Sequence, residues 1–186
     1  MAAMQVLYEA EGWGMGQLVV DDGRVVWHEL PWPRAGGPLS TPSQPPTHPG
    51  HGAGAAAVLS PNASGQGGGF VAEVVRLLQA YFAGGSPPLE DVPVDLEYET
   101  PFLSRCAAAL RAVPRGEVVT YGELAALAGA PGAARAAGSF CARNRLGLFV
   151  PCHRVVAAGD LGSYGSYGVA YKRRLLTLEG STNALG

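Results

Sequence analysis

The sequence predicts an α/β protein in two parts: an N-terminal sheet with one or two helices, then a mostly helical C-terminal part. Residues 4–32 alternate apolar and polar side chains as strands do, whereas several later segments keep a helical period. Charge divides the chain at a similar place. Residues 1–100 carry three Arg and no Lys against eleven acidic residues, and residues 101–186 carry ten basic against four acidic residues. We therefore expect one domain at 1–97 and a second, basic domain at 98–186, for which a polyanion is a candidate partner.

Composition excludes several classes of protein. The 186 residues are 47% hydrophobic, enough for a buried core. No apolar run approaches the roughly 18 residues of a membrane span, and the start of the chain does not resemble a secretory signal. Three cysteines form an odd, sparse set that does not suggest a disulfide framework. We expect no membrane contact and a cytoplasmic location.

The first elements are strands. MQVLYEA and GQLVVDD alternate, the turn signal Asp22-Gly23 follows, and RVVWHEL continues the pattern. Residues 33–69 are rich in Pro, Gly and Ala and nearly free of charge, so we expect a flexible linker or long surface loop. His48 and His51 lie in this segment without a third ligand nearby, and we predict no metal site there.

Helical segments follow. FVAEVVRLLQAYFAGG keeps one face apolar and ends at Gly84-Gly85, and an acidic, proline-containing connector leads to PFLSRCAAALRAVP, a helix stopped by Pro114. GEVVTY predicts a short extended segment. YGELAALAG predicts a helix that Gly129 ends, and after an APG turn GAARAAGSFCARN predicts another. Two short helices across a Gly-containing turn form a helix-turn-helix pattern.

The second of these helices has two interpretations. Its side chains are mostly small, and its long charged residues are Arg135 and Arg143. Small side chains such as Ala134 and Gly138 suit either a tightly packed core helix or one that lies close against DNA. The basic charge of this half favours the DNA-facing interpretation.

The stretch LFVPCHRVV places Cys152 beside His153 and Arg154. A thiol is a good nucleophile only as thiolate, so activation requires a base or a positive charge nearby. His153 can accept a proton directly or through water, Arg154 supplies fixed charge, and Glu179 is our choice to orient the imidazole. Two alternatives stay open: a buried structural cysteine, and a zinc site using Cys141, Cys152 and His153, whose spacing matches no closed four-ligand pattern.

The whole set of motifs resembles the O6-alkylguanine-DNA alkyltransferases. YFAG at 81–84, the PF at 101–102, GEVVTYGELAALAG, RAAGSFCARN, PCHRVV and KRRLLTLEG keep the order and spacing of that family over about 100 residues. The resemblance implies a ribonuclease-H-like N-terminal domain and a winged-helix-like C-terminal domain. It also implies irreversible, single-turnover transfer of the alkyl group of O6-alkylguanine in double-stranded DNA to Cys152, after base flipping, by a monomer without cofactor or metal.

The resemblance also implies a role for each matching residue. Cys152 is the acceptor, His153 the base, Glu179 its partner, and Asn144 the hinge before the active-site strand. Tyr121, Val155, Tyr164, Gly165 and Ser166 contact the guanine. The residues implied to face DNA are Arg135, which enters the base stack, together with Ala134, Gly138 and Arg143.

One departure affects the substrate pocket. The family's pocket loop commonly reads tyrosine, serine, two glycines, but this chain reads YGSYGVA, with an apparent extra residue and an added Tyr167. A non-catalytic DNA-lesion binder of the alkyltransferase-like class is therefore the second hypothesis, although such proteins lack the cysteine. A cysteine hydrolase is a third, disfavoured by the absence of a Gly-rich oxyanion loop.

Overall fold

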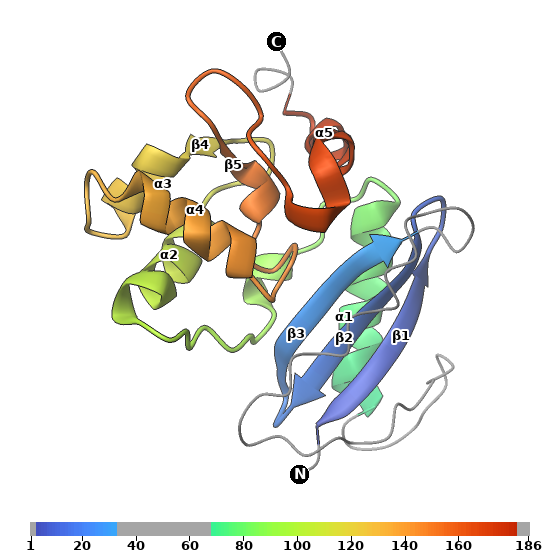
Figure 1. The fold of residues 1–186 in the computed structure, drawn as a ribbon. Coiled ribbons are helices and arrows are strands. Elements are labelled where there is room, and N and C mark those ends of the chain that lie inside the picture. The colour runs from blue at the N-terminus through green and yellow to red at the C-terminus, as the bar shows by residue number, and fades with distance from the viewer. Residues whose placement is uncertain (1–2, 33–67, 182–186) are drawn as a thin grey trace. The chain divides into compact units, whose positions relative to one another are not determined.

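The computed structural model describes residues 3–32 and 68–181. The chain divides into two compact units, Met1–Asp95 and Leu96–Gly186, each of which is described by itself (Figure 1). Strands and helices are both present, as the predicted α/β class requires. His48, His51 and nearly all of the loop expected at 33–69 lie outside the described residues. No helix within the described ranges is long and apolar enough to cross a bilayer.

Three antiparallel strands form the sheet of the first unit. They are β1 (Met4–Ala10), β2 (Gly14–Asp21) and β3 (Arg24–Trp32), in the spatial order β1-β2-β3. The β2–β3 turn has Asp22 at φ 45° and Gly23 at φ 71°. Positive φ at both central residues is what an Asp-Gly hairpin turn supplies, and it matches the right-handed twist of the strands.

Helix α1 (Gly68–Phe82) lies along one face of this sheet, as Figure 1 shows. Its buried side chains include Val71, Val74 and Leu78, and Trp13 Nε1 donates to the Phe82 carbonyl over 3.1 Å. A short 3₁₀ helix, η1 (Leu89–Asp91), follows, and Val94 then bridges to Val25 of β3. The first unit is thus a two-layer arrangement of one sheet and one helix.

A close cross-strand contact organises the sheet. Tyr8 on β1 is opposite Gly16 on β2, and a Cβ on Gly16 would fall 2.4 Å from the Tyr8 ring. Only glycine leaves room for that ring, which reaches across β2 so that the Tyr8 hydroxyl lies 2.6 Å from His28 Nε2 on β3. Both side chains are buried, so this hydrogen bond satisfies two polar groups inside the core.

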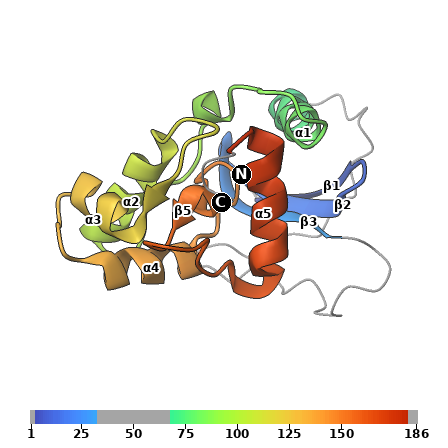
Figure 2. The ribbon, with the colours of Figure 1, turned by 90° about the horizontal axis from the view of Figure 1, so that it is seen from above.

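The second unit is built from helices around a two-stranded ladder. Its elements are α2 (Pro101–Arg111), β4 (Val119–Thr120), α3 (Tyr121–Leu127), α4 (Ala134–Arg143), η2 (Cys152–Arg154), β5 (Val155–Val156), η3 (Gly165–Tyr167) and α5 (Gly168–Glu179). Both views place β5 between α5 and the group formed by α2, α3 and α4 (Figures 1 and 2). Strands β4 and β5 are parallel, with Val119 opposite Val155.

Local chemistry fixes where α3 begins. The Thr120 hydroxyl accepts from the Glu123 backbone N–H over 3.2 Å, and the Glu123 carboxylate accepts from the Thr120 N–H over 2.6 Å. This capping box satisfies two backbone donors that a helix N-terminus leaves unpaired. It also fixes Tyr121 as the first residue of α3, directly after the β4 residue that pairs with β5.

Candidate active site

Cys152 lies at the start of η2, immediately before β5. As a residue Cys152 is of intermediate exposure, whereas the next residue, His153, is fully buried. Strand β5 pairs with β4, β4 runs directly into Tyr121 of α3, and the Tyr121 hydroxyl and the Cys152 thiol are close enough to act on each other electrostatically. The thiol is close to several polar side chains.

Burial and the neighbouring polar groups shift the pKa of the Cys152 thiol in opposite directions. Burial raises the pKa of the Cys152 thiol above its ordinary value. Polar contacts from Asn144 and Tyr164 and the positive charge of Lys172 lower the pKa, but burial outweighs them. The resting sulfur is accordingly a protonated thiol at neutral pH, and a base is needed to remove its proton.

Arg154 corrects one expectation from the sequence. We expected its charge to act on Cys152, but its guanidinium instead holds the Glu179 carboxylate in a two-point ion pair, Nε to Oε2 at 2.9 Å and Nη2 to Oε1 at 2.8 Å. Successive residues of a 3₁₀ helix point about 120° apart, so sequence neighbours need not share a partner. The positive charge acting on the sulfur comes from Lys172.

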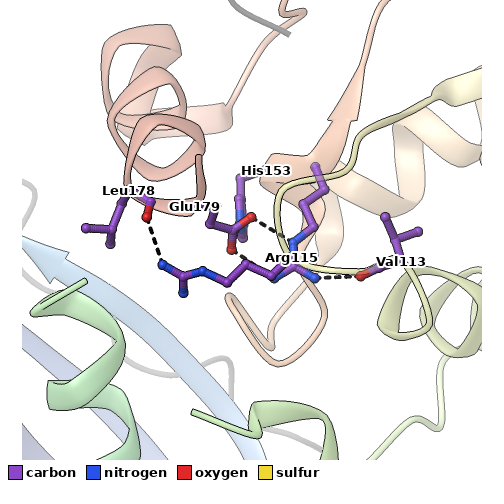
Figure 3. Close-up of polar contacts among 6 residues, drawn as sticks. Val113, Arg115, His153, Leu178 and Glu179 are labelled. Carbon is purple, nitrogen blue, oxygen red and sulfur yellow. Dashed lines mark hydrogen bonds and ion pairs between the residues drawn. The ribbon is translucent and has the colours of Figure 1, made fainter. Parts of the chain in front are cut away.

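His153 and Glu179 form the buried pair that the sequence suggested. His153 Nε2 lies 3.0 Å from Glu179 Oε1, and neither side chain has exposed surface (Figure 3). Burial lowers the pKa of His153, against the effect of Glu179, so the imidazole is neutral and able to accept a proton. Burial alone raises the pKa of Glu179, but hydrogen bonds and charges from His153 and Arg154 outweigh it and hold the carboxyl ionised.

The loop after α2 makes two hydrogen bonds next to the His153–Glu179 pair. The Val113 carbonyl accepts from Arg154 Nη1 over 2.6 Å, and Arg115 Nη2 donates to the Leu178 carbonyl over 2.8 Å (Figure 3). Next to Arg115, Gly116 has φ +87°, and a Cβ there would approach the Glu179 carbonyl to 3.3 Å. The last turn of α5 is thereby fixed where it presents Glu179 to His153.

Lys172 is a residue of the site that the sequence analysis missed. It is fully buried on α5, and its Nζ donates to the carbonyls of Val155, Leu161 and Ser163. Burial lowers its pKa, an effect that nearby thiols and Asp160 oppose. The signal was available: Lys172 lies three and four residues before Leu175 and Leu176, on the apolar face of the helix.

Asn144 joins the end of α4 to the segment before Cys152. Its Nδ2 donates to the Val150 carbonyl over 2.7 Å, and its Oδ1 accepts from Leu146 N and Tyr98 Oη, each over 3.1 Å. The amide also contacts the Cys152 sulfur. Such a set of partners fixes the turn between α4 and Cys152, and the hinge role of Asn144 stays a prediction.

Tyr121 lies between two glycines. A Cβ on Gly138 of α4 would meet the Tyr121 ring at 3.8 Å, and a Cβ on Gly162 would fall 3.1 Å from the hydroxyl. Burial raises the pKa of Tyr121, and its hydroxyl contacts Ser163, so the phenol keeps its proton and can donate it in a hydrogen bond. Gly138, which we expected to face DNA, thus has one side against Tyr121.

The expected guanine contacts are distributed around the same loop. Tyr164 is buried, while Gly165 and Ser166 of η3 are exposed. The Val155 carbonyl already accepts from Lys172 over 2.5 Å. A carbonyl oxygen has a second lone pair, so this bond does not exclude a further donor.

Helix α4 has one buried and one exposed face. Ala137 and Phe140 are fully buried, whereas Arg135 and Arg143 are exposed and Ala134 is partly exposed. One face of α4 is therefore part of the core, and on the other face the DNA-facing interpretation stays a prediction. Arg143 Nε donates to the Ser139 carbonyl over 3.2 Å, which directs that guanidinium along the helix.

The zinc alternative has no support in the described ranges. Cys106, Cys141 and Cys152 are free thiols, and the described residues contain no group of three or more His, Cys, Asp or Glu placed to hold a metal ion. Burial strongly raises the pKa of Cys141, so this second thiol near the site is protonated.

The site and its supporting helices match a known family. A family model described as "6-O-methylguanine DNA methyltransferase, DNA binding domain" matches residues 101–181. The crystal structure of Mycobacterium tuberculosis O6-methylguanine methyltransferase superposes with a TM-score of 0.70 at 31% identity, covering 96% of this chain and 93% of that one. The chain belongs to the O6-methylguanine DNA methyltransferase family. This confirms the family suggested by the sequence motifs.

Two further comparisons bear on what family members bind. The same M. tuberculosis protein has been crystallised in complex with DNA, and that structure superposes equally well. A relative from Mycobacterium leprae, methylated-DNA–protein-cysteine methyltransferase, is 46% identical over 113 residues. The aligned part covers 60% of this chain and 66% of that relative.

Proposed function

We propose that this protein repairs DNA by direct reversal, moving the alkyl group of O6-alkylguanine irreversibly to Cys152. The observation that carries the proposal is a free cysteine, Cys152, directly followed by a buried His153–Glu179 pair. A relative named methylated-DNA–protein-cysteine methyltransferase and a family structure in complex with DNA support it.

The proposed reaction is a displacement at the alkyl carbon. His153 removes the thiol proton, directly or through water, and Glu179 stabilises the imidazolium that forms. Because Glu179 engages Nε2, the proton would enter at Nδ1. The sulfur forms a bond to the alkyl carbon while the carbon–O6 bond breaks, and the bonding pair leaves with guanine. The Tyr121 hydroxyl donates a hydrogen bond to that developing anion, and the proton held by His153 finally returns to the base.

The reaction ends in a thioether. A thioether is stable, and burial keeps Cys141, the other thiol near the site, protonated, so we propose that each copy reacts once. The chemistry uses only thiol, imidazole, carboxylate and phenol groups of this chain, and we propose that it needs no metal or cofactor.

Access to the lesion requires base flipping. An alkyl group on O6 lies within the stacked duplex, and extruding the nucleotide costs a few kcal/mol. We propose that α4, with its small side chains, enters the minor groove and that exposed Arg135 fills the vacated place in the stack. Ala134 and Arg143 would lie against the backbone, where the minor groove offers little sequence readout. That suits a protein that finds damage in any sequence.

The remaining proposals concern organisation. We propose that residues 1–97 form a ribonuclease-H-like domain and 98–186 a winged-helix-like domain whose α3–turn–α4 segment is a helix-turn-helix. We further propose that a monomer acts on duplex DNA in the cytoplasm. Gly165 and Ser166 would offer backbone N–H groups to O6, and the Cys152 and Val155 carbonyls would accept from the guanine amine.

Intact-mass spectrometry tests the proposed transfer. The full chain is incubated with duplex DNA containing O6-methylguanine, beside the variant Cys152→Ala. We expect a mass gain of one methyl group in the natural chain and none in the variant. Tight, lesion-dependent DNA binding without a mass gain would instead support the non-catalytic binder, for which the altered pocket loop is the reason.

A further inference from the structure

A half-buried tyrosine is joined to the backbone at Cys152 by a chain of hydrogen bonds. The Tyr98 hydroxyl donates to Asn144 Oδ1 over 3.1 Å, and Asn144 Nδ2 donates to the Val150 carbonyl over 2.7 Å. The same carbonyl accepts from the backbone N–H of Cys152 over 2.8 Å. Three consecutive hydrogen bonds therefore lead from the Tyr98 hydroxyl to the residue that carries the acceptor thiol.

The two ends of the Asn144 amide have partners of opposite kind. Its oxygen accepts from the Leu146 N–H as well as from Tyr98, whereas its nitrogen donates to the Val150 carbonyl. The oxygen and nitrogen of an amide are nearly equal in size, so the hydrogen-bond partners decide which end points where. The Tyr98 hydroxyl is one of the donors that keep the oxygen on its own side and the nitrogen towards Val150.

The segment that ends at Val150 has a strained backbone. Leu148 is buried and has φ 67°, in the left-handed region that residues with a Cβ rarely adopt. The Val150 N–H donates to the Leu146 carbonyl over 2.8 Å, which closes a turn around Leu148. Such strain persists only where the surrounding contacts hold it. The hydrogen bond from Asn144 to the Val150 carbonyl is one of those contacts, two residues before Cys152.

The Tyr98 ring is itself held by contacts within the second unit. Its centroid lies 5.3 Å from that of Phe140, edge to face, and the Arg145 guanidinium carbon lies 4.5 Å from the centroid of the Tyr98 ring. Arg145 Nη2 also donates to the Glu97 carbonyl over 2.7 Å. The Tyr98 N–H donates to Ser104 Oγ over 3.1 Å. These contacts fix the position from which the phenol hydroxyl donates.

We propose that Tyr98 is a positioning residue for alkyl transfer: its hydroxyl orients the Asn144 amide, which fixes the backbone that carries Cys152. The inference rests on the proposed role of Cys152 as alkyl acceptor. Displacement at carbon needs the sulfur in line with the breaking bond, and a small misplacement of a reacting group slows a reaction. Tyr98 packs against Phe140, on the buried face of α4, so its hydroxyl acts on the acceptor segment and not on DNA.

Hydrogen–deuterium exchange of the full chain, followed by mass spectrometry, tests the positioning without DNA. Tyr98→Phe removes only the hydroxyl and keeps the ring. The amides of Val150 and Cys152 are hydrogen-bonded in the strained segment, and we expect them to exchange about fivefold faster, the usual effect of losing one hydrogen bond. Tyr8→Phe is the matched control. It removes a hydroxyl bonded to His28 in the other unit and should leave these two amides unchanged.

Single-turnover transfer measures whether this positioning serves the reaction. Rates are followed over a range of concentrations of duplex DNA that contains O6-methylguanine. In Tyr98→Phe we expect the maximal rate to fall about fivefold and the half-saturating DNA concentration to stay unchanged. Asn144→Ala removes the amide through which Tyr98 acts, so the double variant Tyr98→Phe with Asn144→Ala should match Asn144→Ala alone.

Three results would overturn the proposal. The first is an exchange rate at Val150 and Cys152 that is unchanged in Tyr98→Phe, or raised equally in Tyr8→Phe. The second is an unchanged maximal rate of transfer beside faster exchange, because the contact would then support the fold alone. The third is a further loss of the same size when Tyr98→Phe is added to Asn144→Ala. The first two need only Tyr98→Phe and its control, so they apply even when Asn144→Ala does not fold.

The exchange experiment separates this inference from the proposed function. Transfer by the natural chain with unchanged exchange in Tyr98→Phe would refute the positioning role and leave the proposed function standing. No transfer by the natural chain, with faster exchange in Tyr98→Phe, would refute the proposed function and leave the hydrogen bond to Asn144 as a support of the segment before Cys152.

Discussion

Helices α4 and α5 both carry charged residues but place them in opposite environments. On α4, Arg135 and Arg143 are exposed, and the buried positions are apolar. On α5, Lys172 and Glu179 are buried among apolar residues and fully engaged with groups of the same unit. Exposed charge can act on a partner outside the molecule, whereas buried charge organises the interior.

This difference between the helices predicts that substitutions on α4 and on α5 have different effects. Changes on α4 should alter association with DNA and leave folding nearly intact. Changes on α5 should alter stability and the chemistry at Cys152 together, because Lys172 and Glu179 support the sulfur and its base. Three variants on the two helices test this division, in order of expected effect, and a fourth changes His153, the partner of Glu179.

Glu179→Gln should have the largest effect. It leaves His153 and the Arg154 guanidinium without their carboxylate, and breaking a buried pair commonly destabilises by about 3–5 kcal/mol. Transfer should slow by about 100-fold, because the imidazolium loses its stabilising charge. Urea unfolding and single-turnover transfer measure the two losses. Glu117→Gln, at an exposed carboxylate, is the control, and an equal loss in both variants would remove the special role of Glu179.

Lys172→Met should follow. The apolar stem is kept, but the carbonyls of Val155, Leu161 and Ser163 lose their shared donor. We expect a loss of about 2–4 kcal/mol in the free energy of unfolding, since unsatisfied buried acceptors are costly. The neighbouring Arg173→Met, exposed on the same helix, should change it by less than about 0.5 kcal/mol. Similar losses from the two would contradict the difference between buried and exposed charge.

Arg135→Ala tests the exposed face of α4. Affinity for a damaged duplex should fall by about tenfold, with little change in unfolding free energy. The loss should be greater on duplex than on single-stranded DNA, because only the duplex requires a replacement for the flipped base. Fluorescence anisotropy on both substrates measures this. Equal losses on the two would count against insertion of Arg135 into the stack.

The smallest effect concerns pH and His153. Burial lowers the pKa of His153 in the folded chain, so below about pH 6.5 the unfolded chain binds a proton that the folded chain does not. Stability should therefore fall as the pH drops from 7 towards 5. His153→Gln should make the unfolding free energy less dependent on pH over that interval. An unchanged slope in the variant would mean that His153 titrates normally in the folded protein.

The sequence revealed the parts of this molecule that local chemistry determines. Asp22-Gly23 suits its turn, and the α/β class follows from periodicity. The pairing of His153 with Glu179, 26 residues apart, was suggested by the chemistry of the catalytic group and is present in the structure. That these residues act as proposed stays a prediction.

Other features depend on tertiary packing. Lys172 was not distinguished from its neighbours in KRR, although its spacing from Leu175 and Leu176 was a signal. The packing of α5 buries it and leaves Arg173 exposed. Arg154 was assigned to the wrong partner because a 3₁₀ turn directs neighbouring side chains apart. The ring contacts among Tyr164, Tyr167 and Tyr171 depend on how the extra residue of the pocket loop is accommodated, which the sequence alone does not show.

Peptide mapping after reaction with DNA that carries a labelled O6-methyl group tests the account most directly. The account predicts one label per chain, located on the peptide with Cys152, and none on the peptides with Cys106 or Cys141. Label on either of the other two cysteines, or no label while damaged DNA is still bound, would contradict it.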